Sequence, residues 1–151
     1  MLPMKVRLNI LFILMGLAVV LSSCRTSAPR LDYQALARAS ILLGVDINLE
    51  DNHKLYLEAA DWIGAPYRGG GDSKKGTDCS GLVYQIYKKV YRIQVPRNSE
   101  ELKDKCYKVA KRNLKEGDLV FFSSSRSRKK VAHVGIYLKN GRFIHSSTSR
   151  G

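Results

Sequence analysis

Apolar residues recur at helical spacing in the first two thirds of the chain and gather into short, unbroken runs near its end. Stripes over residues 31–43, 53–63 and 79–90 predict three amphipathic helices. A capping pattern predicts a fourth, short helix over 98–105, because an asparagine is followed three residues later by a glutamate. The helical pattern therefore stops well before the C-terminus.

The later apolar runs predict strands at 119–122, 131–138 and 142–146. The first reads as a buried strand, and residues 123–130 after it read as an exposed polar loop. Asn140-Gly141, between the second and third strands, is a strong hairpin signal. Helices first and antiparallel strands afterwards predict the α+β fold class, with helices packed on an antiparallel sheet.

The chain begins with the features of an exported protein. Lys5 and Arg7 precede an apolar run over residues 8–21, which is shorter than the roughly twenty residues that span a bilayer. A basic start, a short apolar run and small residues at its end predict a secretory signal peptide at residues 1–23. A transmembrane anchor is the alternative, and the short run argues against it.

Leu21-Ser22-Ser23-Cys24 resembles the lipobox of bacterial lipoproteins, in which the signal peptide is cleaved before the cysteine. This resemblance implies a mature chain that begins at Cys24, carries acyl chains such as palmitate there and is held at a membrane, with 24–30 as a tether. Arg25 stands where a signal for retention in the inner membrane would prefer aspartate. We therefore expect the outer membrane, facing the wall, more than the inner membrane.

The positive net charge favours wall polymers and lipid headgroups as partners, but other features argue against nucleic acid. The chain has 26 Lys and Arg residues against 13 Asp and Glu residues, a net charge of +13. Such a surface is attracted to acidic wall polymers and lipid headgroups. Export, together with basic residues that are scattered and not interleaved with aromatic ones, argues against a nucleic-acid partner.

Cys79 is the candidate reactive residue, because it begins the third predicted helix. Thr77 or Asp78 can cap that helix, and the unpaired N–H groups and dipole of a helix start favour a thiolate. An ordinary thiol, with a pKa near 8.5, is only about 3% thiolate at pH 7. We therefore expect a nearby imidazolium to act with Cys79 as a pair. The glycine-rich residues 64–71 before the helix predict a loop that lines a site.

The chain has three histidines. His53 lies in a polar segment and is expected at the surface. His133 and His145 lie on the two strands of the predicted hairpin, where one can be the base and the other can orient it. These roles require both side chains on one face of the sheet.

The turn of this hairpin decides whether they share a face. A two-residue turn at Asn140-Gly141 would put His145 on the opposite face from His133, because a shift of one residue reverses every side chain. A three-residue loop over 139–141 instead pairs Gly135 with His145. We therefore predict a type I turn with Gly141 left-handed in a bulge.

Structural alternatives remain for these residues. Cys79 could form a disulfide with Cys106, which would consume the nucleophile; otherwise Cys106 is expected to be a small buried residue. A metal site made of Cys79, Cys106, His133 and His145 lacks the usual paired-ligand spacing. The two histidines could also be ordinary core or surface residues. No metal and no cofactor are expected.

Several motifs together resemble the NlpC/P60 family of papain-like cysteine peptidases of bacterial cell walls. The resemblance covers residues 54–151 and rests on Gly64 to Gly71, Thr77-Asp78-Cys79-Ser80-Gly81-Leu82-Val83, Pro96-Arg97, Gly117-Asp118-Leu119-Val120-Phe121-Phe122, His133-Val134-Gly135-Ile136-Tyr137 and Phe143-Ile144-His145-Ser146. It implies an α+β papain-like fold, with the cysteine on a helix packed on the sheet that carries the histidine. It also implies cleavage of the γ-D-glutamyl–diamino acid bond in peptidoglycan stem peptides.

The same resemblance implies roles for particular residues. Cys79 would be the nucleophile, His133 the base and His145 the third, orienting residue. Substrate-binding roles would fall to the residues around the nucleophile. Tyr67 would help hold the substrate or oxyanion, whereas Asp78 and Ser80 would line the N-terminal end of the peptide.

One departure from the family pattern affects the expected domains. Family members usually continue for one or two strands past the third catalytic residue, so a C-terminally incomplete catalytic domain is expected at 54–151, after an N-terminal helical segment at 31–53. A non-catalytic wall-binding lipoprotein that keeps the fold is therefore the alternative function. A lipid acyltransferase of the broader superfamily fits less well, because those proteins usually carry the histidine before the cysteine.

Overall fold

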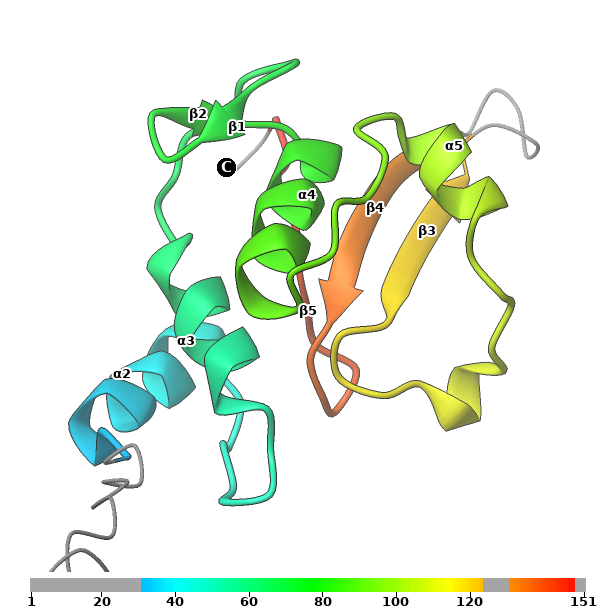
Figure 1. Ribbon diagram of the computed structural model, residues 1–151. Coiled ribbons are helices and arrows are strands. Elements are labelled where there is room, and N and C mark those ends of the chain that lie inside the picture. The colour runs from blue at the N-terminus through cyan, green and yellow to red at the C-terminus, as the bar shows by residue number, and fades with distance from the viewer. Residues whose placement is uncertain (1–30, 124–130, 149–151) are drawn as a thin grey trace, which may run out of the picture. The chain divides into compact units, whose positions relative to one another are not determined.

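The computed structural model describes residues 31–123 and 131–148, and their helices precede an antiparallel sheet (Figure 1). The helices are α2 (Tyr33–Leu43), α3 (His53–Asp61), α4 (Cys79–Val90) and α5 (Ser99–Asp104), with a 3₁₀ turn, η1 (Lys111–Asn113), after them. All four helices lie where the sequence pattern predicts them, and η1 was not predicted. The α+β fold class is confirmed.

The predicted export signals lie outside the described residues. The chain divides into two units, 1–31 and 32–151, and only Leu31 of the first unit is described. The signal peptide at 1–23, Cys24 and the tether therefore stay predictions. Within 31–123 and 131–148, no helix has both the length and the hydropathy that crossing a membrane requires.

The main sheet has the strand order β3-β4-β5, all antiparallel. Its strands are β3 (Leu119–Ser123), β4 (Val131–Tyr137) and β5 (Phe143–Ile144), of which β5 is shorter than predicted. A second, two-stranded sheet joins β1 (Asp72–Ser73) to β2 (Gly76–Thr77) just before α4. The sequence did not predict it, because two-residue strands leave no periodic signal.

The hydrophobic core lies between α4, α3 and the main sheet. Side chains from all three elements are fully or almost fully buried: Leu82, Val83 and Ile86 of α4, Leu55, Tyr56 and Ala59 of α3, and Val134, Ile136 and Ile144 of the sheet. Burying this apolar surface is the main favourable term in folding. Because α4 is anchored by its apolar stripe, its first residue has a defined position relative to β4.

The strand predicted at 119–122 is present, but the prediction that it is buried was wrong. The residues of β3 are half-buried or exposed, and Phe122 is 41% exposed. Alternation along the strand explains this pattern, because Leu119 and Phe121 pack on the core whereas Phe122 lies on the other face. The continuous apolar run therefore serves two faces of the sheet.

The hairpin between β4 and β5 has the predicted register. Tyr137 pairs with Phe143, and the same register continues to place Gly135 opposite His145. His133 and His145 therefore lie on one face of the sheet, as the sequence analysis required. The prediction of the register is confirmed.

The turn type was predicted wrongly. Asn140 and Gly141 both have positive φ, 54° and 75°, and the Arg142 N–H donates to the Lys139 carbonyl at 2.9 Å. This is the pattern of a two-residue type I′ turn, which matches the twist of a hairpin and suits Asn-Gly. The Leu138 N–H donates to the Arg142 carbonyl at 2.9 Å, so Leu138 and Lys139 both face Arg142 in a bulge. The bulge restores the predicted register.

Candidate active site

The first turn of α4 places Cys79 beside a capped helix start. Asp78 has an extended backbone, with φ −100°, and its Oδ1 accepts a 2.7 Å hydrogen bond from the Gly81 N–H. Such a cap satisfies an N–H group that the helix start leaves without a partner. Of the two predicted caps the structure uses Asp78, whereas the buried Thr77 donates to the Asp78 carbonyl at 3.1 Å.

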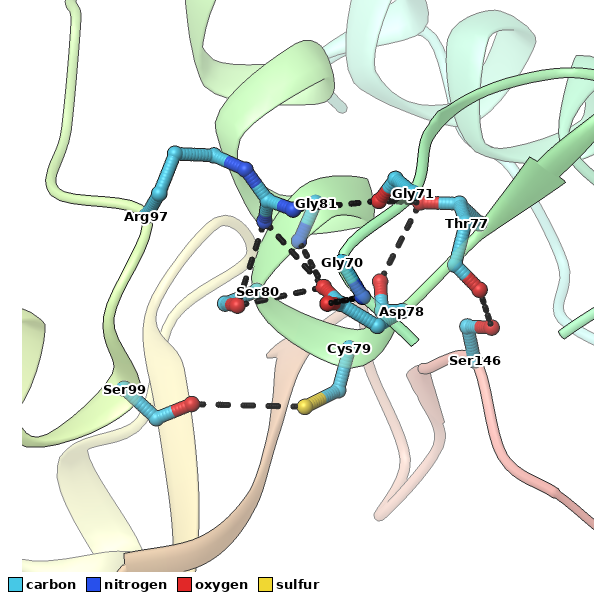
Figure 2. Close-up of polar contacts among 10 residues, drawn as sticks. All are labelled: Gly70, Gly71, Thr77, Asp78, Cys79, Ser80, Gly81, Arg97, Ser99 and Ser146. Carbon is cyan, nitrogen blue, oxygen red and sulfur yellow. Dashed lines mark hydrogen bonds and ion pairs between the residues drawn. The ribbon is translucent and has the colours of Figure 1, made fainter. Parts of the chain in front are cut away.

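Both carboxylate oxygens of Asp78 accept further hydrogen bonds from the protein (Figure 2). Oδ1 accepts from Arg97 Nη1 at 3.1 Å and from Ser80 Oγ at 3.2 Å, and Oδ2 accepts from the Gly70 N–H at 2.7 Å. Burial alone would raise the pKa of this carboxyl, but the Arg97 guanidinium and the two backbone N–H groups outweigh burial and lower the pKa. Asp78 is therefore an anion at neutral pH that ties the glycine-rich loop, α4 and the segment before α5 together.

The glycine-rich loop lies directly against the first turn of α4. A Cβ on Gly81 would lie 2.2 Å from the Gly71 carbonyl oxygen and 2.8 Å from Thr77 Oγ1, so only glycine fits there. Arg97 Nη2 donates to the same Gly71 carbonyl at 3.1 Å. The loop and the helix that carries Cys79 are thus held together as one unit.

No role for Arg97 follows from the sequence alone. It lies in a stretch without helical or strand periodicity, and a lone arginine there is most simply a surface residue. In the structure it donates to Asp78, Ser80 and Gly71. Its place in the Pro96-Arg97 motif is the signal that could have identified it.

The Cys79 thiol is partly buried, and its Sγ lies 4.0 Å from Ser99 Oγ at the start of α5 (Figure 2). Among the described residues, Cys79 forms no hydrogen bond to His133, so their pairing stays a prediction. α4 and β4 pack together, and both begin at the top of Figure 1. Cys79 is the first residue of α4 and His133 is the third residue of β4. Catalytic hydrogen bonds are often long before substrate binds and shorten in the complex.

His133 and His145 are joined by a hydrogen bond. His133 Nε2 lies 2.8 Å from His145 Nδ1, and the two rings meet edge to face at 89°. A neutral imidazole has one N–H and one lone pair, so one ring donates and the other accepts. When His133 Nε2 is the donor, its Nδ1 keeps a lone pair that can take a proton.

Both histidines favour the neutral form. Burial lowers the pKa of His133 and His145, and the neighbouring His145 lowers that of His133 further. An imidazolium beside Cys79 was predicted, but two partly buried imidazoles that share one hydrogen bond do not favour a charge. Burial therefore favours the neutral form of both imidazoles at pH 7.

The disulfide alternative for Cys79 and Cys106 is contradicted. Cys79 and Cys106 are both free thiols, which contradicts the disulfide, and Cys106 is exposed where a buried residue was expected. Its Sγ donates to the Leu102 carbonyl at 3.2 Å. Residues 31–123 and 131–148 contain no group of three or more His, Cys, Asp or Glu side chains that could hold a metal. His53 lies apart, with Nε2 2.7 Å from the Asn48 carbonyl oxygen.

Tyr67 lies beside the segment that leads into α4. It forms an isolated parallel bridge with Thr77 and is 39% exposed. Ser80 is 6% exposed, and its hydroxyl is bonded to Asp78 and Arg97. The substrate-binding roles expected for Tyr67, Asp78 and Ser80 stay predictions.

These elements define an α+β protein with a cysteine at the start of a helix, packed on an antiparallel sheet that carries a bonded histidine pair. The chain belongs to the NlpC/P60 family, whose model matches residues 64–151. The family resemblance of the sequence motifs is thereby confirmed.

Similar proteins are known in sequence and in structure. The chain is 38% identical over 104 residues to the murein DD-endopeptidase MepS/murein LD-carboxypeptidase of Escherichia coli K12, covering 69% of this chain and 54% of that protein. It is 32% identical over 163 residues to a probable endopeptidase NlpC homolog of Haemophilus influenzae, covering 93% of this chain and 86% of that one. The chain thus spans about half the length of the E. coli relative.

The fold also matches a solved structure. The crystal structure of an NlpC/P60 family protein from Bacillus cereus ATCC 10987 superposes with a TM-score of 0.61 at 34% sequence identity. The match covers 70% of this chain and 34% of that one. The predicted NlpC/P60 fold is therefore confirmed.

Proposed function

We propose that this protein is a peptidoglycan endopeptidase that hydrolyses amide bonds of stem peptides, with Cys79, His133 and His145 as its catalytic residues. Membership of the NlpC/P60 family and the names of its relatives support the reaction class. The observation that carries the site is the 2.8 Å hydrogen bond between His133 Nε2 and His145 Nδ1. It fixes one imidazole by means of the other, as a base and its orienting residue require.

In the first half of the reaction, Cys79 Sγ attacks the carbonyl carbon of the scissile amide and its proton passes to His133 Nδ1. The backbone N–H of Cys79, at the start of α4, donates to the oxyanion that forms. His133 then returns the proton to the leaving amine as the C–N bond breaks. The product is a thioester on Cys79.

In the second half, water attacks the thioester and gives a proton to His133. The C–S bond breaks, the acid product leaves, and Cys79 regains its proton. His145 accepts the hydrogen bond from His133 Nε2 throughout and so holds the His133 ring in one orientation. No cofactor takes part in this scheme.

We place the scissile bond between γ-D-glutamate and the diamino acid, as the motif resemblance implies. Asp78 would then lie near the N-terminal end of the stem peptide, where its lowered pKa keeps a negative charge for an ammonium group. Ser80 is bonded to it, and Tyr67 lies alongside. The murein DD-endopeptidase activity in the name of the E. coli relative makes a D,D cross-link the competing substrate.

We also propose that the protein is an exported lipoprotein anchored through Cys24, in the outer membrane facing the wall. The basic start, the short apolar run and the cysteine after two serines support this location. Mass spectrometry of the mature N-terminus tests it. An acylated Cys24 supports the anchor, and a free N-terminus at another residue contradicts it.

Digestion of purified muropeptides followed by mass spectrometry tests the reaction. Both uncross-linked stem peptides and D,D-cross-linked dimers should be offered, so that the products identify the bond. We expect cleavage by the wild type and by Cys106→Ala, and none by Cys79→Ala, because Cys79, unlike Cys106, lies at a helix start. The Cys106→Ala variant shows whether the loss of a thiol elsewhere in the chain is enough to abolish cleavage.

A second outcome would favour the non-catalytic alternative. Among the described residues the Cys79 thiol contacts Ser99 and no histidine. A thiol without a base beside it is also consistent with a protein that keeps the fold for binding and not for catalysis. Wild-type protein that sediments with insoluble peptidoglycan and cleaves no linkage would be a wall-binding lipoprotein. Cleavage that persists in Cys79→Ala would contradict the proposed nucleophile.

A further inference from the structure

Four aromatic rings form a closed circuit on the sheet face that carries the histidines. The distances between neighbouring ring centroids are 6.0 Å from Phe122 to His133, 4.8 Å from His133 to His145, 5.1 Å from His145 to Phe143 and 5.2 Å from Phe143 to Phe122. The register explains the circuit, because Phe122 pairs with His133 across β3 and β4, and Phe143 precedes His145 by two residues. All four side chains therefore lie on one face.

Gly135 forms the floor of this circuit. A Cβ at this position would lie 2.8 Å from Phe143 Cδ2, 2.8 Å from the Ile144 carbonyl oxygen and 3.3 Å from His145 Cβ. The bare backbone of Gly135 therefore lets the Phe143 ring lie against β4, where any larger residue would push it away together with the chain that carries His145.

We propose that Phe122 and Phe143, seated over Gly135, are positioning residues that fix the geometry of the histidine pair and keep water from it. The single hydrogen bond between the imidazoles joins one nitrogen of each ring and leaves some freedom in the tilt of each ring. A neighbouring ring on each side removes this freedom, because tilted aromatic pairs prefer particular geometries. The catalytic meaning of this role rests on the proposed hydrolase function.

The surroundings of the pair explain why exclusion of water keeps it uncharged. Phe122 and Phe143 bring no charge. α4 and α5 pack against β4, and near the start of β4 they bring two titratable groups, the Cys79 thiol and Glu100. Glu100 Oε1 accepts a 2.9 Å hydrogen bond from the Val131 N–H. On β4 itself the next titratable group on this face is Tyr137. Among the described residues no carboxylate bonds either imidazole, so nothing offsets their burial.

Histidine titration by NMR of the full chain tests the proposal without any substrate. The chain has three histidines, and His53 lies on α3, apart from the pair. In the wild type we expect the pair to titrate below the ordinary value of 6.5. Phe122→Leu and Phe143→Leu should move both resonances towards that value, because each opens the pair to water.

Phe121→Leu is the matched control, since Phe121 is the neighbour of Phe122 on β3 and packs on the core side. It should leave the titration of His133 and His145 unchanged. Should Phe143→Leu not fold, Phe122→Leu carries the test, because its ring is 41% exposed. Unchanged titration in a folded Phe122→Leu variant would overturn the proposal.

Activity measurements separate this proposal from the proposed function. Gly135→Ala, which displaces the circuit, should lower kcat about 10²-fold and leave KM nearly unchanged, because misplacing a catalytic group by about 1 Å has that effect. Wild-type protein without cleavage activity but with the expected titration would contradict the function and support the positioning role. Normal kcat in both phenylalanine variants of an active enzyme would contradict the positioning role and leave the function standing.

Discussion

The start of α4 and the histidine end of the sheet are held by different interactions. Asp78 accepts hydrogen bonds from four donors in three segments of the chain and carries a charge. The histidine pair shares one hydrogen bond and is otherwise enclosed by aromatic rings. Polar contacts therefore fix the start of α4 that carries Cys79, whereas strand register and packing fix the position of His133.

This difference indicates how the start of α4 and the histidine pair should each respond to substitutions. The polar network around Asp78 should tolerate the loss of one donor but not a shift of the loop against the helix. The histidine end should depend on contacts between residues that are distant in sequence. The two ends can therefore be disturbed separately, with separate effects on activity and stability.

Loss of the base should have the largest effect. His133→Gln keeps a polar side chain but removes the proton acceptor, so we expect kcat to fall about 10⁴-fold with little change in stability. Cleavage of stem peptides followed by mass spectrometry measures it. His53→Gln, on α3 and away from the site, is the control and should keep wild-type activity. Substantial cleavage by His133→Gln would contradict its role as base.

The orienting residue should show a graded effect. His145→Ala removes the acceptor for His133 Nε2, so we expect kcat to fall about 10²-fold. His145→Asn offers a carbonyl oxygen in place of Nδ1 and should retain more activity than the alanine variant. Equal kcat for the two variants would mean that His145 orients nothing and only fills space.

The loop-to-helix contact should mainly affect stability. Gly81→Ala drives a Cβ to 2.2 Å from the Gly71 carbonyl, and we expect a loss of about 2–3 kcal/mol from the forced displacement. Gly69→Ala is the matched control, because nothing lies within 4 Å of its Cβ position. Thermal unfolding of both variants measures the difference. Equal melting temperatures would show that the loop moves away without cost.

The charge on Asp78 should have the smallest effect, and one that depends on pH. Asp78→Asn weakens the contact with Arg97, and we expect a loss of about 1–2 kcal/mol at pH 7. The pKa of Asp78 lies below its ordinary value of 3.8 in the folded state, so the stabilisation is complete above that value and is lost as the pH falls through the folded pKa.

Urea unfolding at pH 7 and pH 3 measures this dependence. The difference between wild type and Asp78→Asn should shrink at the lower pH. Asp61→Asn is the control, since Asp61 forms an ion pair at 60% exposure and should contribute less than about 1 kcal/mol. If the difference in unfolding free energy between wild type and Asp78→Asn does not change with pH, the charge of Asp78 contributes nothing to stability.

Local patterns in the sequence were enough to predict the capped helix start that carries Cys79. Asp78 is a cap because a short acidic side chain precedes an apolar stripe, and both signals lie within a few residues of Cys79. The register of the hairpin followed from a functional requirement, that His133 and His145 share a face. The turn type did not, because the bulge was predicted at Gly141 and lies at Leu138 and Lys139.

Contacts between distant segments could not be predicted. Arg97 reaches Gly71 across 26 positions, and no periodicity marks it. The aromatic circuit needs the register of all three strands before Phe122 and Phe143 can be placed side by side. The neutral state of the histidines likewise depends on burial, which the sequence does not show.

The central claim is that Cys79 and His133 act as a pair, and thiol alkylation tests it most directly. Iodoacetamide labelling at pH 7, resolved by peptide mass mapping, compares Cys79 with Cys106. Cys106 is an exposed residue, but partial burial of its sulfur raises the pKa of the thiol. We predict that Cys79 reacts faster than Cys106 in the wild type and loses this advantage in His133→Gln. Equal rates in the wild type, or a Cys79 rate that His133→Gln leaves unchanged, would contradict the account.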